Sequence, residues 1–272
     1  MKFAICKILF GSASLEEFFG VAEKLKFDGV EFGYEESFKR YPVASDLRKA
    51  LADKALKWAG SYWGADWHVE GLRESFIEQA QKRAKYMLEA GCNTIIIGPP
   101  ARFKGYEEKK NEYLEKTCVT INAIGKVASN MGLRVGIHNH YGTTIESSEE
   151  IDYVMQHTDA GLVGFCPDTA HLAVSGCDAL NVVKRYVDRV VYLHLKDAIK
   201  PGEFVPRNEK WDERLRDLGK GQIPLKEILK SLKSHGYEGW ISYEQDHPQR
   251  GETAEESASA SKKYIELELK NL

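Results

Sequence analysis

Four acidic or imidazole side chains stand near the ends of predicted strands in the second half of this 272-residue chain: Glu146, Asp168, His194 and Glu244. Three carboxylates and one imidazole form an oxygen-rich donor set, which suits Mn²⁺, Mg²⁺ or Co²⁺ better than a thiolate-type structural Zn²⁺. We predict that these residues hold one divalent cation, with Zn²⁺ as a further candidate. Without the cation, mutual repulsion is expected to raise the pKa values of the carboxylates.

Two histidines share one predicted strand before this group. The stretch 136–140 reads GIHNH, so alternation places His138 and His140 on the same face, and Gly136 leaves space beside them. Each imidazole alone could equally be a hydrogen-bonded packing residue. We predict that both contact a substrate, together with Asp246 and Trp63. The tryptophan belongs to a set of aromatic residues that could either wall a sugar-sized ligand or pack in the core.

Short runs of β-branched or aromatic residues alternate with amphipathic stretches along the whole chain. The runs predict eight strands, at 3–10, 29–32, 57–63, 93–97, 133–140, 162–166, 189–194 and 239–244. The amphipathic stretches predict helices at 14–26, 45–56, 69–90, 107–130, 148–157, 179–187, 225–235 and 254–269. Glycines directly after several helical stretches are typical helix ends.

These eight strand–helix units average about 34 residues each, and no linker or change of composition separates them. Strict alternation predicts a parallel α/β sheet, and eight units favour a closed (β/α)₈ TIM barrel over an open doubly wound sheet. We expect a single domain over residues 1–272. The loop after the first strand also lacks a glycine-rich phosphate motif. In a barrel the strand ends share one rim, so the four candidate ligands can converge.

The overall composition limits the partners. The chain has 38 basic and 41 acidic residues, a net charge of −3, which offers no general attraction for nucleic acid or an anionic membrane. Its five cysteines are odd in number and include no C-x-x-C pair, as expected for reduced thiols. No apolar run is long enough for a signal peptide or a membrane span. We predict a cytoplasmic protein that binds neither nucleic acid nor a membrane, and leave a homo-oligomer open.

The order and spacing of these residues resemble the xylose isomerase-like TIM-barrel superfamily, which includes sugar isomerases, ketose 3-epimerases and inosose dehydratases. The resemblance covers essentially the whole chain and is most specific over residues 135–197. There the patterns HNH-x-GT from His138, DT-x-H from Asp168 and H-x-KD from His194 look like inosose dehydratase. The stretches 218–224, 236–241 and 244–246 are similar to the same family.

This resemblance implies a cation held by a Glu, an Asp, a His and a Glu. Asp168, His194 and Glu244 match three of these ligands directly. Many relatives carry a glutamate where this chain has His138, so either Glu146 or His138 itself supplies the first ligand. We favour Glu146, because it keeps the donor set oxygen-rich. The resemblance also implies that a histidine three residues after the aspartate faces the substrate.

The chemistry implied by the family is that of a metal-dependent sugar isomerase or epimerase. The proton α to the carbonyl of a keto-sugar or keto-polyol is removed through a metal-stabilised enediolate. Glu244 would be the base, with His171 and Lys196 as acids or charge stabilisers. The alternative is an inosose-dehydratase-like lyase that eliminates water from a keto-inositol or keto-sugar. Lys196 and the lack of a matching epimerase arginine after the seventh strand point toward it.

Two functions of other classes are disfavoured. An abasic-site endonuclease of the same superfamily needs more histidine ligands and a basic rim for phosphates, whereas this chain is acidic overall. A non-catalytic sugar-binding barrel would be expected to have lost the ligand set, which this sequence retains. Bound metal would separate the second of these from an enzyme.

Overall fold

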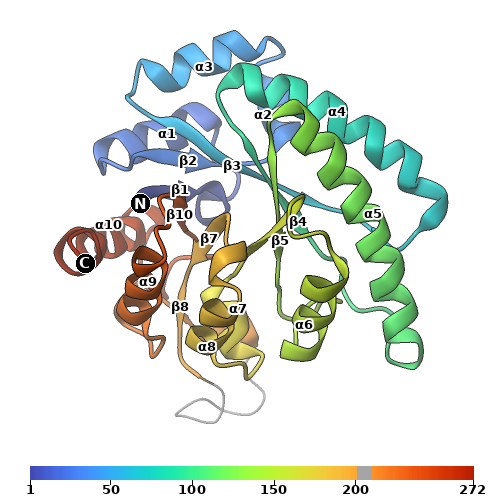
Figure 1. Ribbon diagram of the computed structural model, residues 1–272. Coiled ribbons are helices and arrows are strands. Elements are labelled where there is room, and N and C mark those ends of the chain that lie inside the picture. Colours follow the sequence, from blue (N-terminus) through green and yellow to red (C-terminus); the bar gives the residue numbers. More distant parts are fainter. Residues whose placement is uncertain (201–209) are drawn as a thin grey trace.

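Eight parallel strands form the wall of a nearly closed barrel in the computed structural model, which describes residues 1–200 and 210–272 (Figure 1). Around the wall their order is β6-β5-β4-β3-β2-β1-β10-β7, and each pair of neighbours in this order is parallel. The strands are β1 (Lys2–Cys6), β2 (Gly29–Glu31), β3 (Lys57–Gly64), β4 (Thr94–Gly98), β5 (Arg134–His138), β6 (Val163–Cys166), β7 (Tyr192–Leu195) and β10 (Trp240–Tyr243). The predicted (β/α)₈ barrel is confirmed.

The barrel closes between β6 and β7 through a short seam. Val191 N donates to Phe165 O at 2.9 Å, and His194 N donates to Pro167 O at 3.0 Å. Two isolated parallel bridges cross the seam, one between Phe165 and Val190 and one between Asp168 and His194. The seam therefore makes two of the predicted metal ligands direct backbone neighbours.

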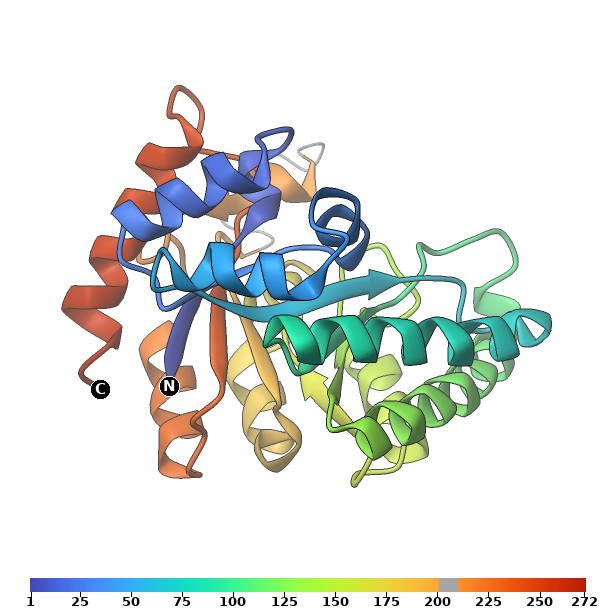
Figure 2. The same ribbon diagram turned by 90° about the horizontal axis from the view of Figure 1, so that it is seen from above.

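Helices surround this sheet on its outer side (Figures 1 and 2). They are α1 (Leu15–Lys24), α2 (Tyr34–Arg40), α3 (Ala44–Ala52), α4 (Arg73–Ala90), α5 (Lys110–Met131), α6 (Ser148–His157), α7 (Thr169–Val174), α8 (Ala179–Arg185), α9 (Leu225–Ser234) and α10 (Ala254–Tyr264), which continues as a π-helix over Ile265–Leu269. A two-stranded antiparallel ribbon, β8 (Asp197–Ala198) and β9 (Leu215–Arg216), follows β7. Within the described ranges, no helix is both long and apolar enough to cross a membrane.

Local sequence signals explain where several helices begin and end. Capping boxes at Ser14, Ser147 and Thr253 open α1, α6 and α10, each with a glutamate three residues later. Gly91 and Gly132 end α4 and α5 in the left-handed conformation, with φ of 92° and 95°. These signals set the lengths of the helices that pack on the strands.

The core has two parts. Most buried apolar residues pack between the sheet and the helices. A separate cluster comes from inward positions of the strands and fills the barrel: Ala4, Ala59, Ile96, Cys166, Tyr192 and Trp240. Two glycines make room for its aromatic rings, because a Cβ on Gly60 would lie 2.9 Å from Tyr192 and one on Gly29 would lie 2.9 Å from Trp240. The candidate functional groups lie next to this cluster, toward the carboxyl ends of the strands.

Two local predictions need correction. The strand expected at 3–10 ends at Cys6, and Lys7–Phe10 forms a 3-10 helix, in which the Lys7 ammonium donates to Gly11 O at 2.9 Å. The short helices α2 and α7 were not among the predicted elements. Both begin directly after strands, where seven or fewer residues give too little periodicity to identify a helix.

Candidate metal centre and active site

A cavity of about 460 Å³ opens at the carboxyl ends of the strands. Its wall combines β1, β2 and β3 with the segments that follow β5 and β10. Its charged and polar lining residues are Lys7, Glu31, Glu36, Tyr62, His140, Glu244 and Asp246. TIM barrels place their functional groups at this rim, and the volume suits a small ligand.

Three of the four predicted metal ligands meet beside this cavity. Asp168, His194 and Glu244 are buried, and each offers one donor atom within 4.8 Å of the others. His194 Nδ1 lies 3.1 Å from Glu244 Oε2 and 3.9 Å from Asp168 Oδ2. His194 Nδ1 and Asp168 Oδ2 have no hydrogen-bond partner. Both atoms have charged neighbours, Lys196 Nζ at 3.3 Å from Asp168 Oδ2 and Glu244 Oε2 at 3.1 Å from His194 Nδ1, but neither forms a hydrogen bond within the described part of the chain. Buried polar atoms are almost always hydrogen-bonded, so these two atoms fit a cation ligand set.

The position of Asp168 follows from its place between β6 and α7. Its Oδ1 caps α7 and accepts hydrogen bonds from Ala170 N at 3.0 Å and His171 N at 2.9 Å. The cap fixes the carboxylate and leaves Oδ2 directed at His194. Asp168 is therefore both a helix cap and a free donor, which the sequence alone presented as alternatives.

Lys196 places a buried ammonium inside the group. Its Nζ lies 2.6 Å from Glu244 Oε1, 3.0 Å from Asp246 Oδ2 and 3.3 Å from Asp168 Oδ2. It also lies 3.2 Å from His171 Nε2. An ammonium can only donate, so His171 accepts through Nε2. Lys196 thus connects the predicted metal ligands to the predicted acid–base and substrate residues.

The surrounding groups shift the pKa values of Asp168 and Glu244 in opposite directions. Burial raises the pKa of Asp168, and Lys196 offsets this only in part. Burial also raises the pKa of Glu244, but the charges of His194 and Lys196 outweigh it, so this pKa lies below its ordinary value. The expectation that all carboxylates of the group have raised pKa values is wrong for Glu244, because the two cations neutralise the repulsion.

Glu31 is a member of the site that the sequence analysis did not identify. Its carboxylate accepts a hydrogen bond from Tyr192 Oη at 3.0 Å and lies 3.0 Å from His194 Nε2. Burial lowers the pKa of His194, but Glu244 and Glu31 outweigh it and raise this pKa to about 9. The contact with Glu31 occupies Nε2 of His194, so Nδ1 is the nitrogen of this ring that faces Asp168 and Glu244. The only sequence signal was a carboxylate at the end of a short apolar strand.

Glu146, the favoured first ligand, is not brought into the group. Its carboxylate lies 3.3 Å from Arg102 Nε and accepts from Gly142 N at 3.0 Å. Arg102 also pairs with Glu150, at 2.8 Å. The reason is that β5 ends at His138, and the loop that follows carries Glu146 away to the start of α6.

The alternative first ligand, His138, takes the inward position. Its ring is buried, with a centroid 4.8 Å from that of His194, and its Nδ1 has no hydrogen-bond partner. Asp168, His171 and His138 form another group of donor atoms within 4.8 Å. Of the two candidates weighed from sequence, the structure brings His138 and not Glu146 to the site.

Trp63 also lies away from the cavity. Its ring packs against Trp67 and Phe76, with centroids 4.9 Å and 6.2 Å away, in the core between sheet and helices. Side chains alternate along β3, so its neighbour Tyr62 points inward, lines the cavity and stands 5.8 Å from the His138 ring. The prediction that Trp63 contacts substrate therefore chose a residue on the outward face of β3 in place of its inward-facing neighbour.

Two imidazoles lie close together beside the cavity, with their ring planes tilted by 35°. His140 and His171 have ring centroids 3.7 Å apart, and Trp211, which was not predicted, lies 5.6 Å and 4.8 Å from them. Burial and then the Lys196 charge lower the pKa values of both histidines, so both are neutral at pH 7. Asp246 joins them through Lys196. Neutral imidazoles beside a charged lysine can accept or relay a proton.

Comparison with known families agrees with this geometry. A profile described as the xylose isomerase-like TIM barrel matches residues 19–264. The chain belongs to this family. Inosose dehydratase of Bacillus velezensis is 28% identical over 261 residues, covering 89% of this chain and 85% of that protein. Inosose dehydratase of Salmonella agona is 32% identical over 263 residues, covering 90% and 85%.

Solved structures share the barrel. The IOLI protein, solved with a bound zinc atom, superposes with a TM-score of 0.80 at 18% identity, over 100% of this chain and 99% of that chain. The probable 3-DHS dehydratase AsbF from Bacillus anthracis gives 0.78 at 17% identity, over 98% and 100%. The family match and the curated relatives together identify this chain as an enzyme of a sugar-modifying superfamily.

Proposed function

We propose that this enzyme is a divalent-metal-dependent dehydratase that eliminates water from a keto-inositol or a closely related keto-sugar. The observation that carries the proposal is the buried group of Asp168, His194 and Glu244, with the Lys196 ammonium 2.6 Å from Glu244. Inosose dehydratases among the relatives support the choice of lyase, since they align over most of both chains. The family itself also contains enzymes with other sugar chemistry.

Asp168, His194 and Glu244 would hold the cation, through Oδ2, Nδ1 and Oε2, with His138 as the nearest further donor. A divalent cation there would supply Lewis-acid stabilisation of the negative charge of an enediolate. Mn²⁺, Mg²⁺ and Co²⁺ suit the carboxylate oxygens, and Zn²⁺ suits the imidazole as well. Glu31 would keep the His194 ring in the orientation that presents Nδ1.

Glu244 and Lys196 would then work as a base and an acid. Glu244 is ionised and lines the cavity, so it accepts the proton from the carbon next to the substrate carbonyl. The electron pair of that C–H bond then forms a carbon–carbon double bond and expels the β-hydroxyl group. Lys196 or His171 donates the proton with which this group leaves as water. Because Nζ and Oε1 are 2.6 Å apart, the proton on Glu244 can return to Lys196 afterwards.

An isomerase or epimerase is the second candidate. The observation that favours it is the pair of neutral imidazoles of His140 and His171, whose ring centroids lie 3.7 Å apart beside the cavity. Either could hand a proton to a second carbon or to the opposite face of the intermediate, without loss of water. The first proton transfer, to Glu244, is common to both routes.

The test is incubation of the Mn²⁺-loaded enzyme with a panel of keto-inositols and keto-sugars in D₂O. A dehydratase produces an enone chromophore and a product lighter by one water. An isomerase or epimerase incorporates deuterium at carbon, which makes the product heavier, and loses no water. Glu244→Gln serves as the control, since it retains the shape of the side chain and removes the base. The proposal fails if no panel member loses water or exchanges a carbon-bound proton.

A further inference from the structure

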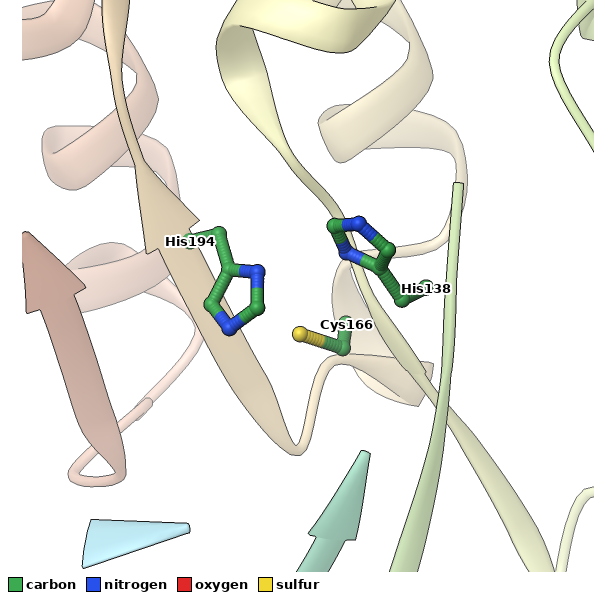
Figure 3. A group of neighbouring side chains, drawn as sticks. All are labelled: His138, Cys166 and His194. Atoms are coloured by element: carbon green, nitrogen blue, oxygen red, sulfur yellow. The ribbon is translucent and has the colours of Figure 1, made fainter. Parts of the chain in front are cut away.

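A second set of metal donors lies beside the oxygen-rich group. It consists of His138 at the end of β5, Cys166 at the end of β6 and His194 in β7. All three side chains are buried, and one donor atom from each lies within 4.8 Å of the others. Because the three strands are neighbours around the barrel, the wall itself brings the donors together (Figure 3).

Two donor atoms of this set form no hydrogen bond. Nδ1 of His138 and Nδ1 of His194 are both buried without a hydrogen-bond partner among the described residues, and His194 Nδ1 lies 3.1 Å from Glu244 Oε2. Figure 3 shows the two imidazole rings facing each other, with the thiol of Cys166 directed toward the space between them. Leaving a buried polar atom without a hydrogen bond is unfavourable. Two such atoms aimed at one point, beside a thiol, therefore indicate a ligand that is shared by all three side chains.

The chemistry of the donors identifies the class of that ligand. Two imidazole nitrogens and a thiolate sulfur prefer Zn²⁺ and softer metal ions, whereas Asp168 and Glu244 provide only oxygen. Metal–nitrogen and metal–sulfur bonds of about 2.0 and 2.3 Å place tetrahedral ligands roughly 3.5 Å apart. Small side-chain movements would bring the three atoms to that spacing. We propose that His138, Cys166 and His194 form a second cation site, selective for Zn²⁺-like and softer metal ions.

The second site excludes the first. His194 belongs to both donor sets, and its Nε2 is held by Glu31 at 3.0 Å. Only Nδ1 is left for a metal, and one nitrogen lone pair binds one ion. A soft ion between His138 and Cys166 therefore takes His194 from the oxygen-rich group. The enzyme can hold a hard cation or a soft one at His194, but not both, so its state depends on which metal is supplied.

Cys6 provides the matched control for the sulfur. It is also buried, and it forms a donor group with Glu31 and Glu244. The carboxylate of Glu31 already accepts from Tyr192 and contacts His194. We therefore expect Cys166, and not Cys6, to bind the soft ion. Forming the sulfur–metal bond displaces the thiol proton to solvent.

Co²⁺ titration of the metal-free 272-residue protein tests the proposal, because thiolate-to-cobalt charge transfer absorbs in the near ultraviolet and oxygen ligands give no such band. The wild type and the Cys6→Ser variant are expected to show the band. Cys166→Ser is expected to lose it while still binding Co²⁺ through the oxygen-rich group. Asp168→Asn is expected to keep the band, since it removes only an oxygen donor. Zn²⁺ added in stoichiometric amount should abolish it.

Thermal melting of each metal-free variant checks that it folds, and Cys166→Ala replaces Cys166→Ser if the hydroxyl destabilises the interior. The proposal is overturned if the wild type and Asp168→Asn both lack the charge-transfer band. It is equally overturned if the band survives Cys166→Ala or disappears in Cys6→Ser. This result is independent of the proposed function, because failure of catalysis would appear as absent turnover with Mn²⁺ and would leave the cobalt spectrum unchanged.

Discussion

Two charged clusters lie at the same rim of the barrel and differ in how completely their atoms are paired. Around Lys196, the buried atoms Asp168 Oδ2 and His194 Nδ1 have charged neighbours but no hydrogen-bond partner among the described residues. Around Arg102, the guanidinium pairs with Glu107, Glu146 and Glu150. We call these the Lys196 cluster and the Arg102 cluster. The number of carboxylates is similar, so free buried donors, and not charge, distinguish a ligand site from a structural network.

The Arg102 cluster has a structural task. Glu150 is buried, and besides Arg102 it accepts hydrogen bonds from Tyr106 Oη and from the backbone of Glu146 and Ser147. These contacts fix the start of α6 and the loop after β5. By holding Glu146 at its edge, the Arg102 cluster keeps this carboxylate out of the Lys196 cluster.

The largest expected effect separates the two clusters by activity. Glu244→Gln removes the proposed metal ligand and the proposed base together, so kcat/KM is expected to fall on the order of 10³-fold or more with the fold intact. Glu146→Gln is the matched control in the Arg102 cluster and is expected to change kcat/KM by less than about threefold. Steady-state kinetics with Mn²⁺ measures both. A large loss of kcat/KM in Glu146→Gln would indicate that Glu146 is a metal ligand and would contradict the distinction between the two clusters.

The Lys196 cluster also makes stability depend on pH. In the metal-free protein the pKa of His194 is raised to about 9, because Glu244 and Glu31 outweigh its burial. Protonated His194 therefore stabilises the fold fully below about pH 6.5, and this contribution is lost as the pH rises toward 9. The loss amounts to about 3 kcal/mol at most. The unfolding free energy in EDTA should fall between pH 6.5 and 8.5, before cysteine thiols of the unfolded chain ionise.

A bound cation changes this profile. It takes the place of the proton on His194 Nδ1, so the Mn²⁺-loaded protein should lose less stability over the same pH range. Urea unfolding at several pH values measures how steeply the free energy of unfolding changes with pH, once in EDTA and once with Mn²⁺. A flat or rising profile in EDTA would show that His194 is not held as a cation by its acidic neighbours.

Glu31 tests how the Lys196 cluster presents its imidazole. Glu31→Gln removes the charge that faces His194 Nε2, and a lost partner of a metal-binding histidine typically reduces metal affinity about 10- to 100-fold. Glu36→Gln is the control at the same cavity, since Glu36 contacts Lys7 at 3.1 Å. Calorimetric titration with Mn²⁺ compares the two. Equal Mn²⁺ affinities of the two variants would show that Glu31 does not support metal binding by His194.

The smallest effect concerns the Arg102 cluster. Arg102→Met leaves the buried carboxylate of Glu150 without its cation, but Tyr106 and two backbone amides remain as donors. The free energy of unfolding is expected to fall by about 1–2 kcal/mol. Mn²⁺ affinity should stay unchanged. A marked loss of affinity without loss of stability would place Arg102 in the metal site.

Sequence pattern predicted the barrel, and it predicted that three of the four candidate ligands lie close together, for one physical reason. Asp168, His194 and Glu244 directly follow or end strands, and the closed parallel sheet delivers all such positions to one rim. Their placement therefore needs only the strand assignment. Lys196 and Asp246 were found in the same way, two residues beyond His194 and Glu244.

The remaining residues depended on contacts that a single sequence does not encode. Glu146 was misplaced because it lies eight residues beyond the end of β5, where loop geometry and Arg102 decide its direction. Trp63 was misplaced because the sequence did not fix which face of β3 points inward. Glu31 was missed because its partner, His194, is 163 residues away and is reached only across the barrel.

The most direct test of the account is a crystal structure of the Mn²⁺-soaked protein with anomalous diffraction data at the manganese edge. We predict one strong anomalous peak in bonding contact with Asp168 Oδ2, His194 Nδ1 and Glu244 Oε2. A peak on Glu146 beside Arg102, or no peak within reach of Asp168, His194 and Glu244, would contradict the account.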